Sequence, residues 1–135
     1  MDNKKRWQQR FDNFDNAYQT FCRIFQVYRQ DKNVEVNKMA LVQGFEFTIE
    51  LAWKTLKDYL EDVGYKNLET PKETIRQAFQ AGLIDNAEDW MAALQKRNLT
   101  SHTYHRSLLQ ESVNFIDHKF HAMISKLYEQ LKAKA

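Results

Sequence analysis

A polar stretch over residues 95–106 contains most of the side chains in this sequence that could do chemistry. Within it, Arg97 and His102 stand five positions apart. The arginine guanidinium offers a fixed fork of hydrogen-bond donors that suits a phosphate group. The histidine titrates near neutral pH and can move a proton on or off a hydroxyl group. Together they are the smallest set of side chains that could cleave an RNA phosphodiester without a metal ion.

In that reaction the 2′-hydroxyl of RNA attacks the neighbouring phosphorus while the histidine transfers the proton. The arginine stabilises the negative charge on the equatorial oxygens. DNA lacks the 2′-hydroxyl and would not be cut in this way. Arginine and histidine often lie near one another by chance, and Arg97, Asn98 and Ser101 could also be ordinary helix-end residues. Composition alone leaves the structural and the functional interpretation open.

The same stretch is basic and contains no acidic residue. The candidate nucleotide-binding or RNA-binding residues in it are Lys96, Asn98, Ser101, His105 and Arg106. The whole chain is nearly balanced, with 20 Lys and Arg against 18 Asp and Glu and a formal net charge of +2. This balance argues against a broad basic surface for nucleic acid but allows a local basic pocket.

The segments that must position this stretch are predicted to be long helices. Aromatic residues follow a 4-3 spacing from Trp7 to Tyr28, which predicts a helix over Asn3–Gln30 whose aromatic stripe is core or interface. A second apolar seam predicts a helix over Val36–Val63, with Val63 in the seam. Within it, Gly44 suggests a close contact between helices. A third seam, which includes Met123, predicts a final helix that starts near His105 to Ser107 and continues to about Lys132.

Two short helices are predicted between the long ones. Thr70-Pro71-Lys72-Glu73 combines a capping box with proline at the first helical position, and Gly82 ends the helix that it starts. Asp85 or Asn86 then caps a helix whose last turn contains Arg97, where a cation suits the helix dipole.

The composition agrees with an all-α protein. Three Gly and one Pro are too few for the turns of an all-β chain, and 43% hydrophobic residues provide ample material for a core. We therefore predict an all-α, up-and-down bundle of three long and two short helices that forms a single domain over residues 1–135. The one cysteine, Cys22, excludes an internal disulfide. The polar N-terminus and the lack of a run of about 20 apolar residues predict a cytoplasmic protein with no membrane partner.

Two further groups of side chains could contribute to a site. Glu50, Trp53 and Lys54 lie on one side of the second predicted helix, and Glu50 and Lys54 form an i,i+4 ion pair in the favourable order. They could be a solvated face or could line a cleft, and both interpretations stay open. His118 and His121 share one helical face, but no carboxylate or cysteine completes a metal site there. We expect no metal ion and no cofactor.

The spacing Arg97-x4-His102-x-Tyr104 resembles the Arg-x4-6-His motif of the HEPN superfamily, in the extended form of HepT-type toxins. Within that superfamily, the nucleotidyltransferase substrate-binding protein family is the closer match. Residues 45–60 are similar to its second helix, residues 71–84 to its middle, and residues 97–104 to its signature loop. The resemblance covers nearly the whole chain and keeps the predicted order of helices.

The resemblance implies a HEPN-type helical bundle that forms a homodimer, with two Arg/His loops in a shared cleft. It also implies a minimal nucleotidyltransferase as partner. In HepT-type systems the HEPN chain is a ribonuclease toxin, and the partner silences it by adenylylating the motif tyrosine. Mapped onto this sequence, Arg97 and His102 are the expected catalytic residues and Tyr104 is the expected site of modification. The aromatic stripe of the first helix and the cleft side of the second are both candidates for the dimer contact.

One position departs from the family pattern. Relatives often have an acidic residue after the tyrosine, whereas this chain has His105 followed by Arg106. The more basic loop suits RNA or nucleotide phosphate, and it leaves the proton transfer unassigned between His102 and His105. The alternative function, from a different class, is a non-catalytic subunit that binds nucleotide or presents substrate to the nucleotidyltransferase. A purely structural helical dimer is a third interpretation, but it leaves the composition of this loop unexplained.

Overall fold

The computed structural model describes residues 4–135, except the side chain of Thr100, and every regular element in this part is helical. This confirms the predicted all-α bundle. The predicted start of the first helix, Asn3, lies outside the described residues. The elements are α1 (Arg6–Gln30), α2 (Glu35–Asp62), α3 (Pro71–Gln80), α4 (Ala87–Leu99), the 3₁₀ turn η1 (Thr100–His102), α5 (Arg106–Phe115), the π-helical segment η2 (Ile116–Phe120) and α6 (His121–Lys134).

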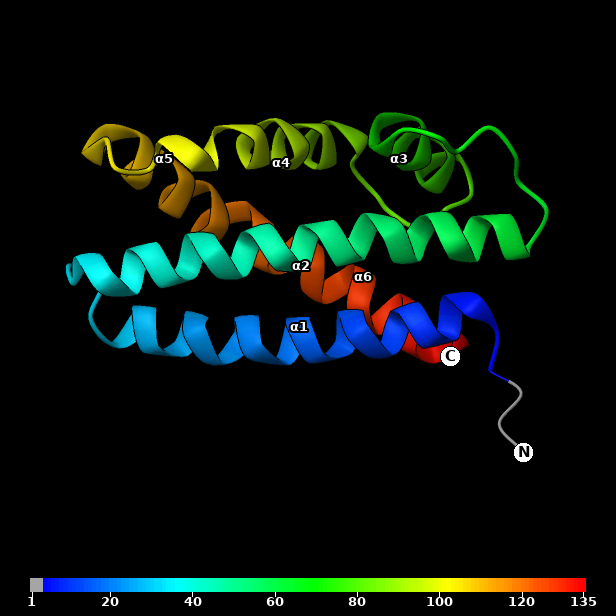
Figure 1. The fold of residues 1–135 in the computed structure, drawn as a ribbon, viewed down its shortest axis with the longest axis horizontal. Coiled ribbons are helices and arrows are strands. Elements are labelled where there is room, and N and C mark those ends of the chain that lie inside the picture. The colour runs from blue at the N-terminus through cyan, green and yellow to red at the C-terminus, as the bar shows by residue number, and fades with distance from the viewer. Residues whose placement is uncertain (1–3) are drawn as a thin grey trace.

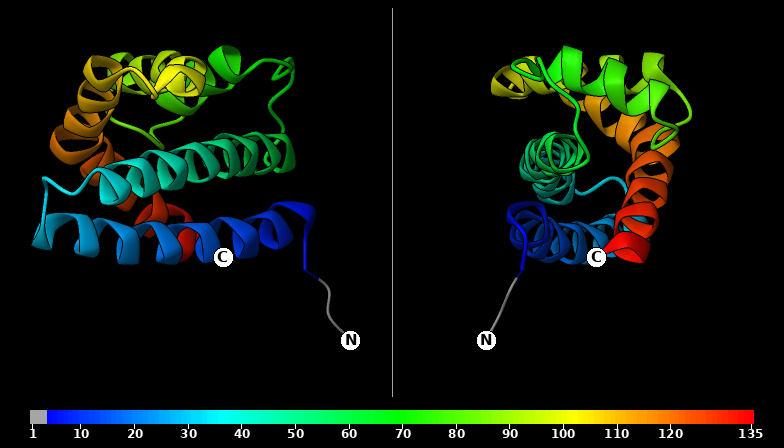
Figure 2. Two further views of the ribbon diagram at one scale, coloured as in Figure 1. Left: turned by 60° about the vertical axis from the view of Figure 1, so that its left-hand side comes forward. Right: turned by 90° about the vertical axis from the view of Figure 1, so that its right-hand side faces the viewer.

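Helix α2 lies in the middle of the molecule. Helix α1 runs antiparallel along one side of it, and α3, α4 and the start of α5 form a layer on the other side (Figure 1). From that layer, the α5–η2–α6 segment descends past α2 and brings the C-terminus beside α1 (Figure 2). Because α2 has neighbours on several sides, its fully buried residues surround much of its circumference: Leu41, Phe45, Thr48, Ile49, Ala52, Thr55, Leu56 and Leu60.

The aromatic stripe of α1 forms much of the core. Six of its seven aromatic residues are buried, and the seventh, Tyr18, is half-buried. Ring pairs join the stripe to the end of the chain, with centroids 5.5 Å apart for Phe21 and Phe120 and 5.7 Å apart for Phe11 and Tyr128. The packing interpretation of the stripe is confirmed. Because these rings are buried in the core of a single chain, the stripe is not available as a dimer contact.

Gly44 marks the predicted close approach of two helices. A Cβ atom at this position would lie 3.3 Å from Ile24 Cδ1 and 3.3 Å from Phe21 Cδ1, which is tighter than most carbon contacts. Glycine therefore lets α2 approach α1 more closely than a larger residue would. The predicted helix ends are also present: Thr70 Oγ1 accepts a hydrogen bond from the Glu73 backbone N–H at 3.2 Å, and Gly82 has a φ angle of 77°.

The predicted place of Val63 in the apolar seam of α2 is wrong. The helix ends at Asp62, and Val63 is its C-cap with 51% of its surface exposed. The following residue, Gly64, has a φ angle of 104°, so the chain leaves the helical path here. Beyond this point the 4-3 spacing no longer places a side chain on the buried face of a helix.

The last predicted helix contains a π-helical segment that shifts its buried stripe. A π turn contains one more residue than an α-helical turn, so the buried stripe after it moves by one position in the sequence. As a result, Ile124 is fully buried and Met123, which the spacing placed in the seam, is only half-buried. Asp117 in this segment accepts hydrogen bonds from Tyr28 Oη at 3.3 Å and Lys32 Nζ at 3.1 Å, which connects it to the end of α1.

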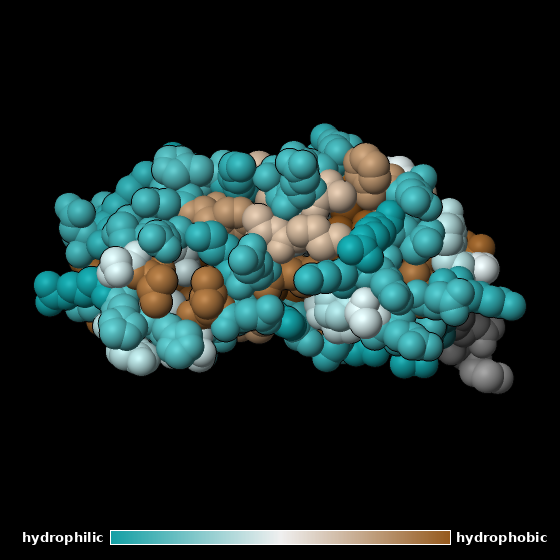
Figure 3. All heavy atoms as spheres, turned by 90° about the horizontal axis from the view of Figure 1, so that it is seen from above, coloured by the Kyte–Doolittle hydropathy of each residue, from teal (hydrophilic) through white to brown (hydrophobic). Residues whose placement is uncertain are grey.

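The outer face of the α3–α5 layer is mostly hydrophilic, with a band of apolar side chains across its middle (Figure 3). None of the described helices combines the length and the apolar character needed to cross a bilayer.

Candidate functional site

The motif loop is the junction between α4 and α5. Arg97 lies in the last turn of α4, η1 carries Ser101 and His102, and His105 is the N-cap of α5. Lys96 and Arg97 therefore stand at the negative end of the α4 dipole, where cations are favourable. The short 3₁₀ turn η1 contacts both α4 and α5, so Arg97 and His102 lie at the same helix junction.

Arg97 is anchored to α2 by an ion pair with Glu50, 47 residues away in the sequence. Its Nη1 donates to Glu50 Oε2, and its Nη2 donates to Asn98 Oδ1 at 3.4 Å. The other carboxylate oxygen, Oε1, lies 3.3 Å from Lys54 Nζ. The arginine side chain is 28% exposed. The structure thus joins four of the predicted site residues in one cluster and places Glu50 and Lys54 beside the loop.

The electrostatics of this cluster keep Glu50 ionised. Burial by itself would raise the pKa of the Glu50 carboxyl, but the Trp53 indole, Arg97 and Lys54 together hold the pKa below its usual value. The indole N–H is buried and makes no hydrogen bond of ordinary geometry to the described residues, although it lies near enough to influence the carboxylate. Glu50 is therefore a counterion for Arg97 at neutral pH and does not carry a proton for acid catalysis.

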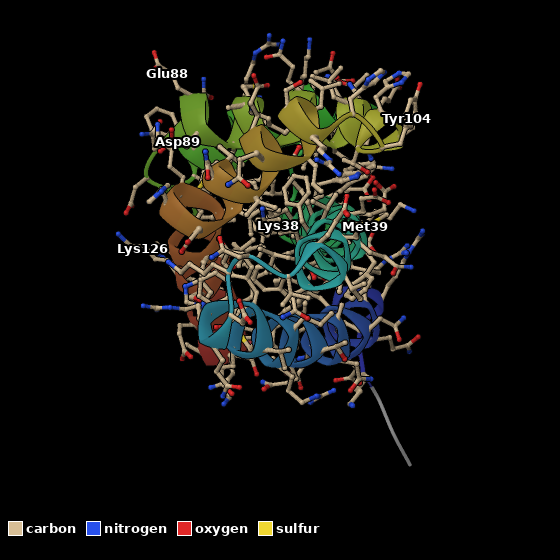
Figure 4. The ribbon with its side chains drawn as sticks, turned by 90° about the vertical axis from the view of Figure 1, so that its left-hand side faces the viewer. Lys38, Met39, Glu88, Asp89, Tyr104 and Lys126 are labelled. Carbon is tan, nitrogen blue, oxygen red and sulfur yellow. The ribbon has the colours of Figure 1, made fainter. Side chains whose placement is uncertain are left out.

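The second half of the motif is an exposed cluster of rings. Tyr104 is 73% exposed, with its ring centroid 6.2 Å from that of His102 and 4.4 Å from that of His105. All three side chains are exposed, as is Ser101, whereas Lys96 is half-buried. Tyr104 projects from the α4–α5 layer on the same side of the bundle as Met39 of α2 (Figure 4). These rings are open to solvent and to any partner that approaches this face.

Arg106 has a separate position within the predicted set. It lines a hollow with the beginning of α2, whose lining includes Glu35 and Lys38. A neighbouring hollow of about 550 Å³ lies between α2 and Thr103 and is lined by apolar side chains such as Val36 and Met39, which are 72% and 49% exposed. The loop thus borders an exposed apolar part of α2.

The two C-terminal histidines are separated by their environments. His118 is exposed, whereas the His121 ring stacks on Phe25 with centroids 4.0 Å apart. Burial, and then Arg29, lower the pKa of His121. In the described part of the chain, no three His, Cys, Asp or Glu side chains converge as they would around a metal ion.

A groove along α4 was missed by sequence reasoning. It has a volume of about 710 Å³ and is bordered by Lys72 and Arg76 of α3 and by one face of α4 that ends at Asn98. The i,i+4 spacing of Lys72 and Arg76 could have shown that the two cations share one face of a helix. That spacing does not predict which helix lies opposite them.

Comparisons with known proteins identify the family of the chain. Residues 9–133 match the family described as nucleotidyltransferase substrate binding protein like. A protein of Haemophilus influenzae named "Probable ribonuclease HepT" is 34% identical over 100 residues, which are 69% of this chain and 66% of that protein. The match therefore spans just under two thirds of that relative.

Two solved structures share the fold. The first, from Haemophilus influenzae, revealed the fold of a substrate binding domain of a nucleotidyltransferase; it superposes with a TM-score of 0.77 at 28% identity and covers 90% of this chain and 98% of that one. The second is a crystal structure from Thermus thermophilus, with a TM-score of 0.68 at 28% identity over 87% of this chain and 97% of that one. With its helical bundle, its motif loop and a match over nearly its whole length, the chain belongs to the nucleotidyltransferase substrate binding protein like family.

Proposed function

We propose that this chain is a metal-independent endoribonuclease, active as a homodimer, that a partner nucleotidyltransferase silences by adenylylating Tyr104. The observation that carries the proposal is the combination of an anchored Arg97 with exposed His102 and Tyr104 rings at one helix junction. Structural needs do not explain this combination, because exposed rings contribute little to folding. The name of the Haemophilus influenzae relative supports the same reaction class.

The chemistry follows from the side chains that meet at the loop. The 2′-oxygen attacks phosphorus and forms a new P–O bond, while its proton passes to a histidine acting as general base. The bond from phosphorus to the 5′-oxygen breaks, and that oxygen takes a proton. The products are a 2′,3′-cyclic phosphate and a free 5′-hydroxyl. We propose His102 as this base, and His105, whose ring centroid lies 4.4 Å from that of Tyr104, is the other candidate.

Arg97 would bind the scissile phosphate and stabilise its developing charge. One face of its guanidinium is already committed to Glu50 and Asn98, which restricts its rotation. A side chain held in this way loses less conformational entropy when the phosphate binds. Lys96, Ser101 and Arg106 would contact neighbouring phosphates or sugars.

Adenylylation of Tyr104 would block this site. The exposed Oη can attack the α-phosphorus of ATP, so that a Tyr–O–P bond forms, the bond to pyrophosphate breaks and the tyrosine proton leaves. The AMP group then adds bulk and negative charge beside His102 and His105. A bound RNA phosphate would be repelled from the same place.

The homodimer contact is proposed on the apolar part of α2 next to the loop. Val36 and Met39 are exposed there, and the aromatic stripe of α1 is buried. A second copy on this face would bring two motif loops to a common cleft.

Toxicity and RNA cleavage test the proposal directly. The wild-type chain, expressed without its partner, should arrest growth, and the purified protein should cleave RNA in the presence of EDTA. Arg97→Ala and His102→Ala should each lower cleavage by at least about 100-fold, and His105→Ala serves as the comparison that assigns the base. If wild type and variants are equally harmless and leave RNA intact, the ribonuclease assignment fails.

One observation favours a second function, a non-catalytic subunit that binds nucleotide for the nucleotidyltransferase. The fold matches a substrate binding domain of a nucleotidyltransferase over almost its entire length. In that case the purified chain would bind ATP or AMP and would raise the activity of the partner without cutting RNA.

A further inference from the structure

We infer that the groove along α4 binds single-stranded RNA next to the scissile bond, with its phosphates on Lys72 and Arg76 and a base against Phe79. The inference rests on the proposed ribonuclease function and adds a substrate-binding site that extends along α4 from the motif loop. It is carried by the shape, the charge and the position of the groove.

The groove leads to the motif loop. Its α4 wall extends from Ala87 to Asn98, which is about 16 Å of helix at 1.5 Å per residue. Asn98, at one end, also accepts the hydrogen bond from Arg97 Nη2. An RNA strand bound in the groove would therefore extend to the Arg97 guanidinium, which would bind the scissile phosphate.

The charge of the groove suits an anion. Lys72 and Arg76 are exposed and form no ion pair with an acidic residue of the described chain. Lys72 also lies in the first turn of α3, where a cation faces the positive end of the helix dipole, so it does not stabilise the helix. Glu88 is the one acidic residue in the lining; it belongs to the first turn of α4, at the end away from Asn98.

The aromatic and apolar parts of the surface suit bases. Phe79 is 47% exposed and follows Lys72 and Arg76 at i+7 and i+3, which places all three on one face of α3. On α4, Met91 and Ala92 line the groove, and Gln95 offers a polar group near its Asn98 end. Cations beside an exposed ring are typical of a surface that binds single-stranded nucleic acid.

A binding experiment tests the groove apart from the chemistry. The protein is the full chain with His102→Ala, and the probe is an unstructured, fluorescein-labelled RNA of about 12 nucleotides, within the range of single-strand site sizes, followed by anisotropy at several salt concentrations. Adding Lys72→Ala and Arg76→Ala should raise Kd about tenfold and lower the slope of log Kd against log salt by about 1.4, since each phosphate contact contributes about 0.7. Adding Phe79→Ala should raise Kd about tenfold without changing the slope, and Phe79→Trp should restore it.

The matched control removes two other lysines, Lys132 and Lys134. They lie in the last turn of α6, at the C-terminus beside α1 and across the bundle from α3 (Figure 1). This pair of substitutions should change neither Kd nor the salt slope by more than about twofold. An equal loss in both double variants would show general attraction between charges and overturn the groove assignment.

Two further outcomes separate this inference from its alternatives. If the Lys72 and Arg76 substitutions leave RNA binding intact but abolish the complex with the nucleotidyltransferase, the groove is a protein-docking surface and the RNA assignment is wrong. If the chain that retains His102 cleaves no RNA while groove-dependent RNA binding persists, the ribonuclease proposal fails and the binding site stands. With cleavage present, the loss of kcat/KM in the groove variants should grow with substrate length, and a loss independent of length would contradict the assignment.

Discussion

The aromatic residues of α1 and those of the motif loop have opposite environments. In α1, rings such as Phe14 and Phe21 are fully buried and contact other rings on η2 and α6. In the loop, the rings of His102, Tyr104 and His105 lie beside one another and face solvent. Rings of similar size thus stabilise the fold in one region and contribute little to it in the other. The rings of α1 are therefore explained by packing, whereas packing does not explain the rings of the loop.

Two tyrosines make the contrast sharper. Tyr128 is buried, its Oη donates to Asp15 Oδ1 at 2.6 Å, and its ring stacks on Tyr18 at 4.2 Å. Tyr104 has a 73% exposed side chain with an accessible hydroxyl. The first hydroxyl is part of a contact between α1 and α6, and the second is free to meet an enzyme.

Truncation of a core ring should have the largest effect on stability. Phe14→Ala removes a fully buried side chain and should lower the free energy of unfolding by about 3–5 kcal/mol, measured by urea denaturation. Tyr104→Ala is the matched truncation in the loop and should cost less than about 0.5 kcal/mol. Similar losses in the two variants would erase the distinction between the regions.

Removing the charge of Glu50 should affect the loop more than the fold. Glu50→Gln removes the negative charge of the carboxylate that pairs with the Arg97 guanidinium, so RNA cleavage should fall about tenfold in kcat with little change in KM. Lys54→Met, which alters the same carboxylate cluster without touching Arg97, is the control. In an Arg97→Ala background the Glu50→Gln change should have no further effect on cleavage. An undiminished effect there would show that Glu50 does not act through Arg97.

The buried tyrosine should make stability depend on alkaline pH. Burial, with a contribution from the hydrogen bond to Asp15, raises the pKa of Tyr128 to about 12, compared with about 10 in an unfolded chain. Its contribution to stability is therefore present below pH 10 and is lost as the pH rises from about 10 to 12. Tyr128→Phe should cost about 1 kcal/mol at pH 7 and should lose stability less steeply over that alkaline range. Equal pH profiles for the variant and the wild type would contradict this account, and Tyr104→Phe serves as the exposed control.

Tyr104→Phe should have the smallest effect on folding and a complete effect on modification. Its free energy of unfolding should stay within about 0.5 kcal/mol of wild type, because the lost hydroxyl is exposed. Incubated with the partner and ATP, the wild type should gain mass in steps of one AMP unit, as measured by intact-protein mass spectrometry. A gain that survives in the variant would move the modification to another residue.

Much of the fold and the identity of the motif could be predicted from local patterns. The 4-3 spacing of aromatic residues located α1, and the Thr70 capping box located the start of α3. Gly44 indicated a close helix contact, and the structure shows that contact with α1. The failures occurred where a regular period was extended too far, as for Val63 beyond the end of α2 and for Met123 beyond the π turn.

The sequence by itself therefore determined which segments are helices and which of their faces are apolar. It also determined that an Arg, a His and a Tyr lie at one helix junction. These properties depend on residues within a few positions of each other, and helix geometry fixes their relation. Only the tertiary structure decided that Glu50 meets Arg97, that Lys72 and Arg76 border a groove ending at Asn98, and that the apolar part of α2 stays exposed beside the loop. Those relations depend on how helices far apart in the chain pack against each other, and a local period does not contain that information.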